Sequence, residues 1–152
     1  MKIDNIKIKN FYSFKEASLN FSNYSGLTLI KGKNKDTGGS NGSGKSALVE
    51  ALFFALTGKT IRKSTEDSLV NNQAKKKCEV QVELTHNNEY VVITRQKKPT
   101  KLEFIVGTDN RTKDTVAATQ EAIDSFLNIN HKVLLASMFF GQSNEINFLE
   151  CS

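Results

Sequence analysis

Residues 39–46 read Gly-Ser-Asn-Gly-Ser-Gly-Lys-Ser and fit the pattern G-x-x-x-x-G-K-[ST] at every fixed position. Glycine has no Cβ, so Gly39, Gly42 and Gly44 allow left-handed backbone conformations and a close approach to a polyphosphate. Consecutive backbone N–H groups in such a loop form an anion-binding nest, and a following helix adds its positive N-terminus. We therefore expect this stretch, a P-loop, to bind the phosphates of a nucleotide.

The P-loop chemistry assigns a role to two side chains. Lys45 is expected to reach the β- and γ-phosphates, and the hydroxyl of Ser46 to ligate Mg²⁺. The predicted cofactors are therefore ATP and Mg²⁺. The predicted nucleotide-binding residues are Gly39, Ser40, Asn41, Gly42, Ser43, Gly44, Lys45, Ser46 and Ala47.

The flanks of the loop fit a P-loop nucleotide-binding domain. Residues 27–30 form a short apolar run that predicts a buried strand. Residues 46–57 are rich in helix formers and apolar on nearly all sides, with Gly58 placed to end a buried helix. Residues 31–38 lie between strand and loop as an insertion that we expect to bulge outward. It either lies near the base or ribose of the nucleotide or contacts nothing.

The remaining patterns predict an α/β fold with an antiparallel β meander. Alternating residues 2–9 indicate an edge or half-buried strand, and residues 86–89 a turn between two strands. An amphipathic helix is expected at 115–127, and Asn130 is expected to begin another helix through 133–136. Further strands are expected at 17–21, 78–85, 90–95, 102–106 and 137–142.

Length and composition indicate one cytoplasmic domain. A chain of 152 residues suits a single core, no apolar run is long enough for a bilayer span, and the N-terminus has no signal-peptide core. Cys78 and Cys151 are too few and too far apart for a disulfide framework or a zinc site. A net charge of +5 allows a polyanionic partner without requiring one.

Several passages together resemble a known family. They are Ile-Lys-Asn-Phe-Tyr-Ser-Phe at 8–14, the P-loop, Ala-Leu-Thr-Gly-Lys-Thr at 55–60, residues 90–95 and Phe-Phe-Gly-Gln-Ser-Asn-Glu-Ile-Asn-Phe at 139–148. In order and spacing the chain resembles the N-terminal ATPase lobe of the SbcC-type DNA-repair ATPases. These are relatives of the SMC proteins and include the large subunit of phage recombination endonucleases. The resemblance implies a P-loop NTPase fold of the ABC-type ATPase head.

The resemblance also implies further site residues. Gln142 matches the Q-loop glutamine that senses Mg²⁺ and the γ-phosphate, which makes it a candidate metal-contacting and catalytic residue beside Lys45. Basic residues of such heads hold the DNA backbone, and the candidates here are Arg62, Lys63, Lys75, Lys76 and Lys77. A solvated lysine-rich turn is the alternative for these residues.

The family pattern is incomplete in this sequence. No apolar run ends in Asp-Glu, no heptads are sustained, neither His86 nor His131 lies where a switch histidine would, and the insertion at 31–38 is unusual. We therefore expect residues 1–152 to be the N-terminal half of a head that binds ATP with little or no hydrolysis. The implied partners are its own C-terminal lobe, a second head in a homodimer, an SbcD-type nuclease subunit and double-stranded DNA, with no membrane. The host cytoplasm is the expected location if a phage encodes the chain.

Two alternatives remain open at this point. The chain could belong to an SMC-, RecF- or RecN-like head, or to a defence ATPase that shares this head. It could instead be a non-catalytic mimic of one head lobe that regulates a full-length ATPase.

Overall fold

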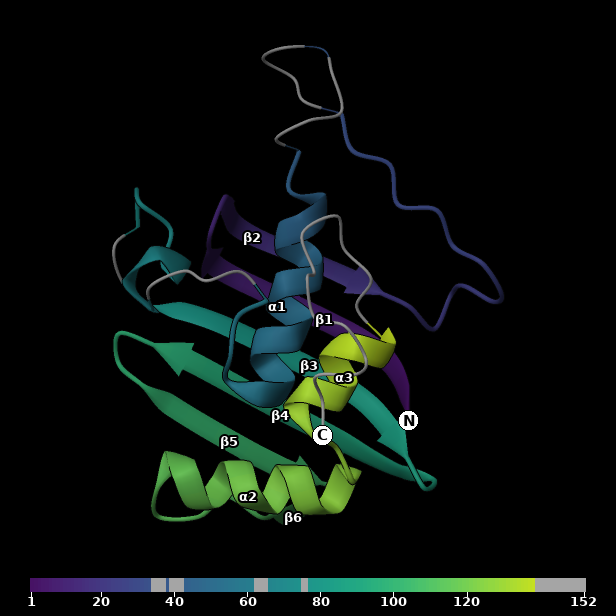
Figure 1. The fold of residues 1–152 in the computed structure, drawn as a ribbon, viewed down its shortest axis with the longest axis vertical. Helices are drawn as coiled ribbons and strands as arrows, with labels where there is room; N and C mark the ends of the chain where they lie inside the picture. The colour runs from purple at the N-terminus through teal and green to yellow at the C-terminus, as the bar shows by residue number, and fades with distance from the viewer. Residues whose placement is uncertain (34–37, 39–42, 62–65, 75–76, 139–152) are drawn as a thin grey trace.

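The computed structural model describes residues 1–33, 38, 43–61, 66–74 and 77–138. Its centre is a six-stranded antiparallel sheet with the order β2-β1-β3-β4-β5-β6 (Figure 1). The strands are β1 (Lys2–Phe11), β2 (Phe14–Asn20), β3 (Cys78–His86), β4 (Glu89–Lys97), β5 (Lys101–Val106) and β6 (Asp109–Asn110). The predicted antiparallel meander is thus confirmed from β3 to β5, and the hairpin loop 107–108 adds β6 beyond the expected strand end.

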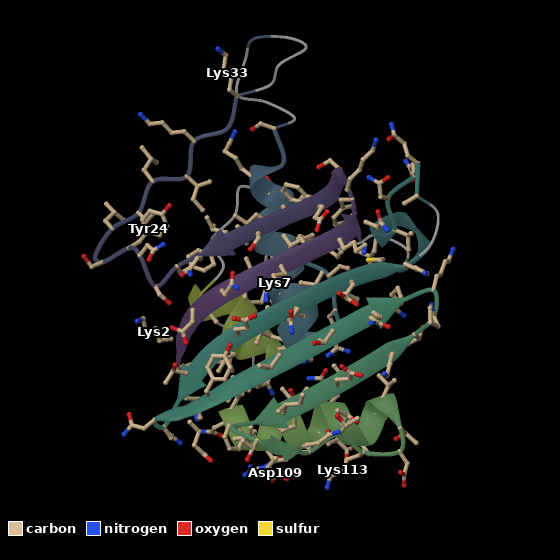
Figure 2. All side chains as sticks on the ribbon, turned by 180° about the vertical axis from the view of Figure 1, so that it is seen from behind. Lys2, Lys7, Tyr24, Lys33, Asp109 and Lys113 are labelled. Carbon is tan, nitrogen blue, oxygen red and sulfur yellow. The ribbon has the colours of Figure 1, made fainter. Side chains whose placement is uncertain are left out.

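The helices lie together on one face of this sheet, while Figure 2, seen from behind, shows the other face without helices. Helix α1 (Lys45–Thr57) packs on β1, β3 and β4, and α2 (Val116–Leu127) packs on β5. Helix α3 (His131–Met138) follows α2, and a short 3₁₀ helix η1 (Glu66–Leu69) lies between α1 and β3. The described helices include none long and apolar enough to cross a bilayer.

Strict alternation of side chains puts the core between the sheet and the helices. In β3 every second residue from Cys78 to Leu84 is fully buried, because successive side chains of a strand point to opposite faces. The register Val82↔Ile93 extends this apolar face to β4. The helix side of the core is made by Phe53, Phe54, Leu56, Ile123 and Leu127.

The helix ends follow the sequence signals. Gly58 ends α1 in the left-handed conformation, at φ 70°, and its N–H donates to the carbonyl of Phe54. Thr115 caps α2 by accepting from the N–H of Ala118. The Oδ1 atom of Asn130 accepts from the N–H of Lys132 at the start of α3. The predictions of these helix ends are confirmed.

The strand predicted at 2–9 is confirmed as half-buried rather than as an edge strand. It lies between β2 and β3, and buried Ile6 and Ile8 alternate with exposed Lys7 and Lys9. The strand predicted at 137–142 does not begin where expected, since residues 137–138 continue α3. An apolar run directly after a helix with no intervening turn signal extends the helix instead. Residues 139–142 lie outside the described part.

The strand predicted at 27–30 is also absent. Residues 23–33 contain no strand, and Leu27 and Leu29 are 102% and 75% exposed. None of the residues that the structure describes hydrogen-bonds to this segment as a neighbouring strand. A strand is stable only when its backbone groups pair and one face is buried, so β-propensity alone does not form one here.

Candidate nucleotide-binding site

The first residues of α1 have the backbone expected of an anion site. Gly44, the N-cap, has φ 88°, in the left-handed region that favours glycine. Among the described residues no side chain caps this helix, and its first turn has no acidic residue. The first amide groups of a helix have no carbonyl partner inside it, and here they face the loop. Such an N-terminus attracts anions through these N–H groups and the helix dipole.

The described P-loop side chains lie at the same end of α1. The Nζ atom of Lys45 is 3.2 Å from the Oγ atom of Ser43, Ala47 is half-buried, and Ser46 is exposed. These groups fit a phosphate, since they offer one cation, two hydroxyls and helix amides. The described residues contain no group of three His, Cys, Asp or Glu that could hold a metal. Of the two predicted metal contacts, the structure describes Ser46, whose hydroxyl could hold Mg²⁺ beside a phosphate.

The turn between β1 and β2 lies directly against Gly44. Because Phe11 pairs with Phe14, this turn consists of Tyr12 and Ser13 alone. A Cβ atom at Gly44 would be 3.0 Å from the Cζ atom of Phe14 and 3.5 Å from the Oγ atom of Ser13. The start of α1 is thus fixed against the first hairpin, which the sequence did not predict.

Gly32 lies against the other side of the P-loop. A Cβ atom there would be 1.9 Å from the Oγ atom of Ser43 and 3.3 Å from the Cγ atom of Lys45. Only glycine fits at this contact without a shift of Ser43, and the contact brings the start of the insertion next to the residues that follow it. The part of the insertion at 34–37 lies outside the described residues, so its place relative to a nucleotide stays a prediction.

Other predicted site residues also lie outside the described part. They are Gly39, Ser40, Asn41, Gly42 and Gln142, together with the DNA candidates Arg62, Lys63, Lys75 and Lys76. The structure therefore brings together Ser43, Gly44, Lys45, Ser46 and Ala47 of the predicted site.

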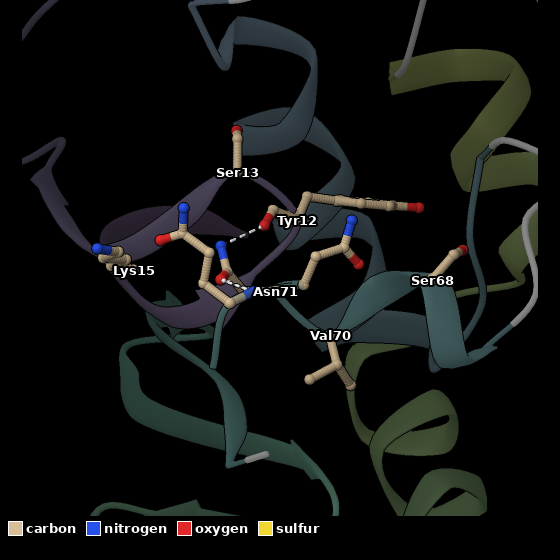
Figure 3. Close-up of a pocket in the computed structure, with 8 residues that line it drawn as sticks. Tyr12, Ser13, Lys15, Ser68, Val70 and Asn71 are labelled. Atoms are coloured by element: carbon tan, nitrogen blue, oxygen red, sulfur yellow. Dashed lines mark hydrogen bonds between the residues drawn. The ribbon is translucent and has the colours of Figure 1, made fainter. Parts of the chain in front are cut away.

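A polar pocket of about 500 Å³ lies beside the first hairpin (Figure 3). Ser13 belongs both to this pocket and to the contact with Gly44, so the pocket borders the P-loop region. A second, mainly apolar cavity of about 210 Å³ lies between β2, residues 30–32 and the start of α1. The lining of the polar pocket is Tyr12, Ser13, Lys15, Ser68, Val70, Asn71, Asn72 and Gln73.

Side chains from β4 and α2 bind the other end of α1. The Nε atom of Arg95 donates to the carbonyl of Ala55 at 3.2 Å, and Gln120 donates to the carbonyl of Leu56 at 3.0 Å. Arg95 also hydrogen-bonds Gln120 and lies over the ring of Phe54, 5.7 Å from its centroid. Burial lowers the pKa of Arg95 to about 10, so the guanidinium stays charged at neutral pH and complements the negative end of the helix.

The residue after Gly58 connects α1 to the start of α3. The Nζ atom of Lys59 is 2.8 Å from the Nε2 atom of His131. Burial, and then the positive charges of Lys59 and Lys132, lower the pKa of His131, while Asp124 opposes them. The neutral imidazole therefore accepts a hydrogen bond from Lys59, and His131 begins a helix as predicted.

Lysines gather where β3 begins and β4 ends. Cys78 pairs with Lys97 and Gln96 with Lys101 in the sheet, and the N–H of Lys77 donates to the carbonyl of Lys98 at 3.0 Å. We name Lys77, Lys97, Lys98 and Lys101 the basic corner. Of the predicted DNA candidates, the structure places Lys77 in this cluster.

Sequence reasoning missed several residues around this site. The basic corner had a usable signal, because counting outward from the turn at 87–88 puts Lys97 opposite Cys78. Ser13 and Phe14 belong to the passage 8–14 that carried the resemblance, but nothing in the sequence indicated that they, or Gly32, contact the P-loop. Asn71 follows a short apolar run and had no local signal either.

The chain has an antiparallel sheet with helices on one face, and one of these helices starts at a P-loop sequence. This arrangement is that of an ATPase-type α/β domain. Residues 5–152 match the AAA domain family, and the chain belongs to that family. The predicted fold class is thereby confirmed.

Named relatives agree with the expected relationship to SbcC-type ATPases. The chain is 26% identical to a DNA double-strand break repair Rad50 ATPase of Thermoplasma acidophilum, over 98% of this chain and 16% of that protein. It is 29% identical to the Methanococcus maripaludis protein of the same name, over 99% of this chain and 14% of that protein. It is 30% identical to exonuclease subunit 2 of Enterobacteria phage T4, over 69% of this chain and 18% of that protein. The chain thus spans less than a fifth of the length of each relative.

Among solved structures, the chain is similar to an SMC head domain from Thermotoga maritima, with 22% identity and a TM-score of 0.47. The match covers 74% of this chain and 39% of that one.

Proposed function

We propose that this chain binds Mg·ATP at residues 39–47 and forms the N-terminal half of an ATPase head that acts on broken DNA. The observation that carries the proposal is the start of α1, where left-handed Gly44 directly precedes the helix, so that the helix N-terminus lies at the P-loop sequence. Lys45 lies at the same place to neutralise phosphate charge. Membership of the AAA domain family and relatives named as DNA double-strand break repair ATPases support the assignment.

The polar pocket beside Ser13 supports binding of a whole nucleotide rather than of phosphate alone. Phosphates at the start of α1 would leave ribose and base near this pocket, because Ser13 lines it and lies against Gly44. Its amide and hydroxyl groups can hydrogen-bond a base edge or a sugar.

Hydrolysis by this chain alone is expected to be very slow or absent. Phosphoryl transfer needs stabilisation of charge and a residue that positions the attacking water. Lys45, Ser46 and Mg²⁺ would supply the first, with Gln142 as a candidate sensor of the γ-phosphate, but no apolar run ending in Asp-Glu supplies the second. Turnover would then need a C-terminal lobe and a second head, whose closing and opening would control access of a nuclease to DNA ends in the cytoplasm.

Calorimetric titration of Mg·ATP, with phosphate release followed in the same samples, tests this function. We expect saturable binding that Lys45→Ala abolishes, without turnover. A matched control is Lys113→Ala, which removes an exposed lysine just before α2, away from the P-loop. No binding to the unchanged chain would refute the nucleotide site. Turnover comparable with a complete head, abolished by Lys45→Ala, would refute the half-head assignment.

The basic corner is proposed as part of the DNA contact, and the name of the phage relative supports a nuclease partner. The logarithm of DNA affinity falls linearly with the logarithm of the salt concentration, and each lysine that neutralises a DNA phosphate makes this slope steeper by about 0.9. Lys77→Gln and Lys98→Gln should each lower this slope by about that amount in a duplex-binding titration. Lys2→Gln, at the opposite end of the sheet (Figure 2), should leave it unchanged. Equal slopes for all variants would contradict the assignment.

A further inference from the structure

Asn71 is a buried polar residue that ties the segment after η1 to the first hairpin. It is only 6% exposed. Its backbone N–H donates to the carbonyl of Asn10 at 2.9 Å, and its side-chain Nδ2 donates to the carbonyl of Tyr12 at 2.7 Å (Figure 3). Its Oδ1 atom accepts from the N–H groups of Gln73 and Ala74 at 3.0 and 3.2 Å. Both ends of the amide are therefore engaged with backbone.

The turn that Asn71 holds is conformationally costly. Tyr12 has φ 46°, in the left-handed region that a bulky L-residue rarely adopts. Such a conformation persists only where surrounding contacts fix it. The contacts here are the Asn71 amide on the Tyr12 carbonyl, the Tyr12 N–H bonded to the carbonyl of Leu69 at 2.8 Å, and the bridge between Phe11 and Val70.

This turn lies against the P-loop. Ser13, its second residue, and Phe14, which follows it, surround the position where a Cβ would project from Gly44. Gly44 precedes the first helical residue, Lys45. A continuous series of contacts thus runs from the Asn71 amide through the Tyr12–Ser13 turn to the start of α1.

We propose that Asn71 is a positioning residue for the nucleotide site: its side-chain amide holds the left-handed Tyr12 turn that places Ser13 and Phe14 against Gly44. The inference rests on the proposed nucleotide binding at residues 39–47. Asn71 lines the polar pocket, but its amide is occupied by one carbonyl and two N–H groups. It therefore acts through the turn rather than by touching the nucleotide.

The central test measures Mg·ATP affinity of Asn71→Ala by calorimetry. Without the Asn71 amide, Tyr12 leaves the left-handed conformation in most molecules. The apparent affinity for Mg·ATP then falls in proportion to the fraction of molecules that keep the turn and can bind. We expect the dissociation constant to rise about tenfold. Asn5→Ala is the matched control, since it removes a side-chain amide of β1 that donates to Glu83 and lies outside the pocket. Val82→Ala controls for general loss of stability by opening the core in β3. Both should bind ATP with unchanged affinity.

Rescue separates positioning from direct contact. Tyr12→Gly removes the cost of the left-handed conformation, so the double variant with Asn71→Ala should regain most of the lost affinity. A direct ligand contact by Asn71 would not be restored by a change at residue 12. Absence of rescue, or an Asn71→Ala affinity equal to that of the unchanged chain, would overturn the proposal.

Amide chemical shifts test the inference independently of nucleotide. In Asn71→Ala the shifts of Gly44, Lys45 and Leu48 should move, whereas in Asn5→Ala they should not. If the unchanged chain does not bind ATP but these shifts move, nucleotide binding fails while the coupling of Asn71 to the P-loop stands. If ATP binds and the shifts stay constant in Asn71→Ala, the coupling itself is refuted.

Discussion

Replacing Gly44 by alanine should be among the most damaging small changes in this chain, for two separable reasons. A left-handed φ of 88° costs an L-residue about 1–2 kcal/mol. The new methyl would be 3.0 Å from the Phe14 ring, and forcing this contact adds about 1–3 kcal/mol by overpacking. We expect a total loss of about 2–5 kcal/mol in the free energy of unfolding.

Urea unfolding followed by far-UV circular dichroism measures this loss, since the chain has no tryptophan for fluorescence. Gly107→Ala is the matched control: Gly107 has φ 58° and open space around its Cβ position, so it reports the conformational cost alone. Phe14→Ala, added to each variant, should restore the stability lost to the steric clash in Gly44→Ala but not in Gly107→Ala. The double-mutant cycle of Phe14 with Gly44 should give an interaction free energy of about 1 kcal/mol or more. Equal losses at both glycines, or additive double variants, would refute the reasoning that the hairpin braces the P-loop.

Burial raises the pKa of the Cys78 thiol to about 12, so in a Cys151→Ser background Ellman's reagent should react only after denaturation; rapid reaction in buffer would contradict its burial. The pKa of His131 is lowered in the folded chain. The neutral imidazole therefore makes its full contribution to stability at pH values above the ordinary histidine pKa. Stability should therefore fall as pH drops through its lowered pKa, by less than about 1 kcal/mol because the site is partly exposed. Thermal unfolding with His131→Gln, which removes the titration, checks this: the variant should lack that pH step, and an unchanged step would disprove it. Gln120→Ala, which leaves an α1 carbonyl without its donor, should cost about 1–3 kcal/mol in urea unfolding, whereas exposed Glu121→Ala should cost almost nothing.

Local patterns in the sequence predicted most of the fold. The alternation in β3 and β4, the polar turn between them and the glycine after α1 are encoded within a few residues. They could be predicted because one face of each strand is buried by elements present in the chain, so periodicity and burial agree. The amphipathic pattern of α2 succeeded for the same reason, with Ile123 and Leu127 facing the sheet.

The failure at residues 27–30 has the opposite cause. Leu27, Leu29 and Ile30 have the composition of a strand, but they pair with none of the described strands, and Leu27 and Leu29 are exposed. Strand propensity measures how well a side chain fits a sheet that already exists. A segment that pairs with no strand can therefore have the composition of a strand without forming one.

The candidate site divides in the same way. The P-loop is predictable because phosphate binding needs glycines, a lysine and a hydroxyl at fixed spacing within one loop. The residues that brace it come from elsewhere: Phe14 from the first hairpin, and Asn71 from the segment after η1. Their roles depend on the left-handed backbone of Gly44 and Tyr12, and no pattern of residue types reveals that two such positions meet. Motif chemistry is therefore readable from the sequence, whereas the contacts that hold a motif in place require the fold.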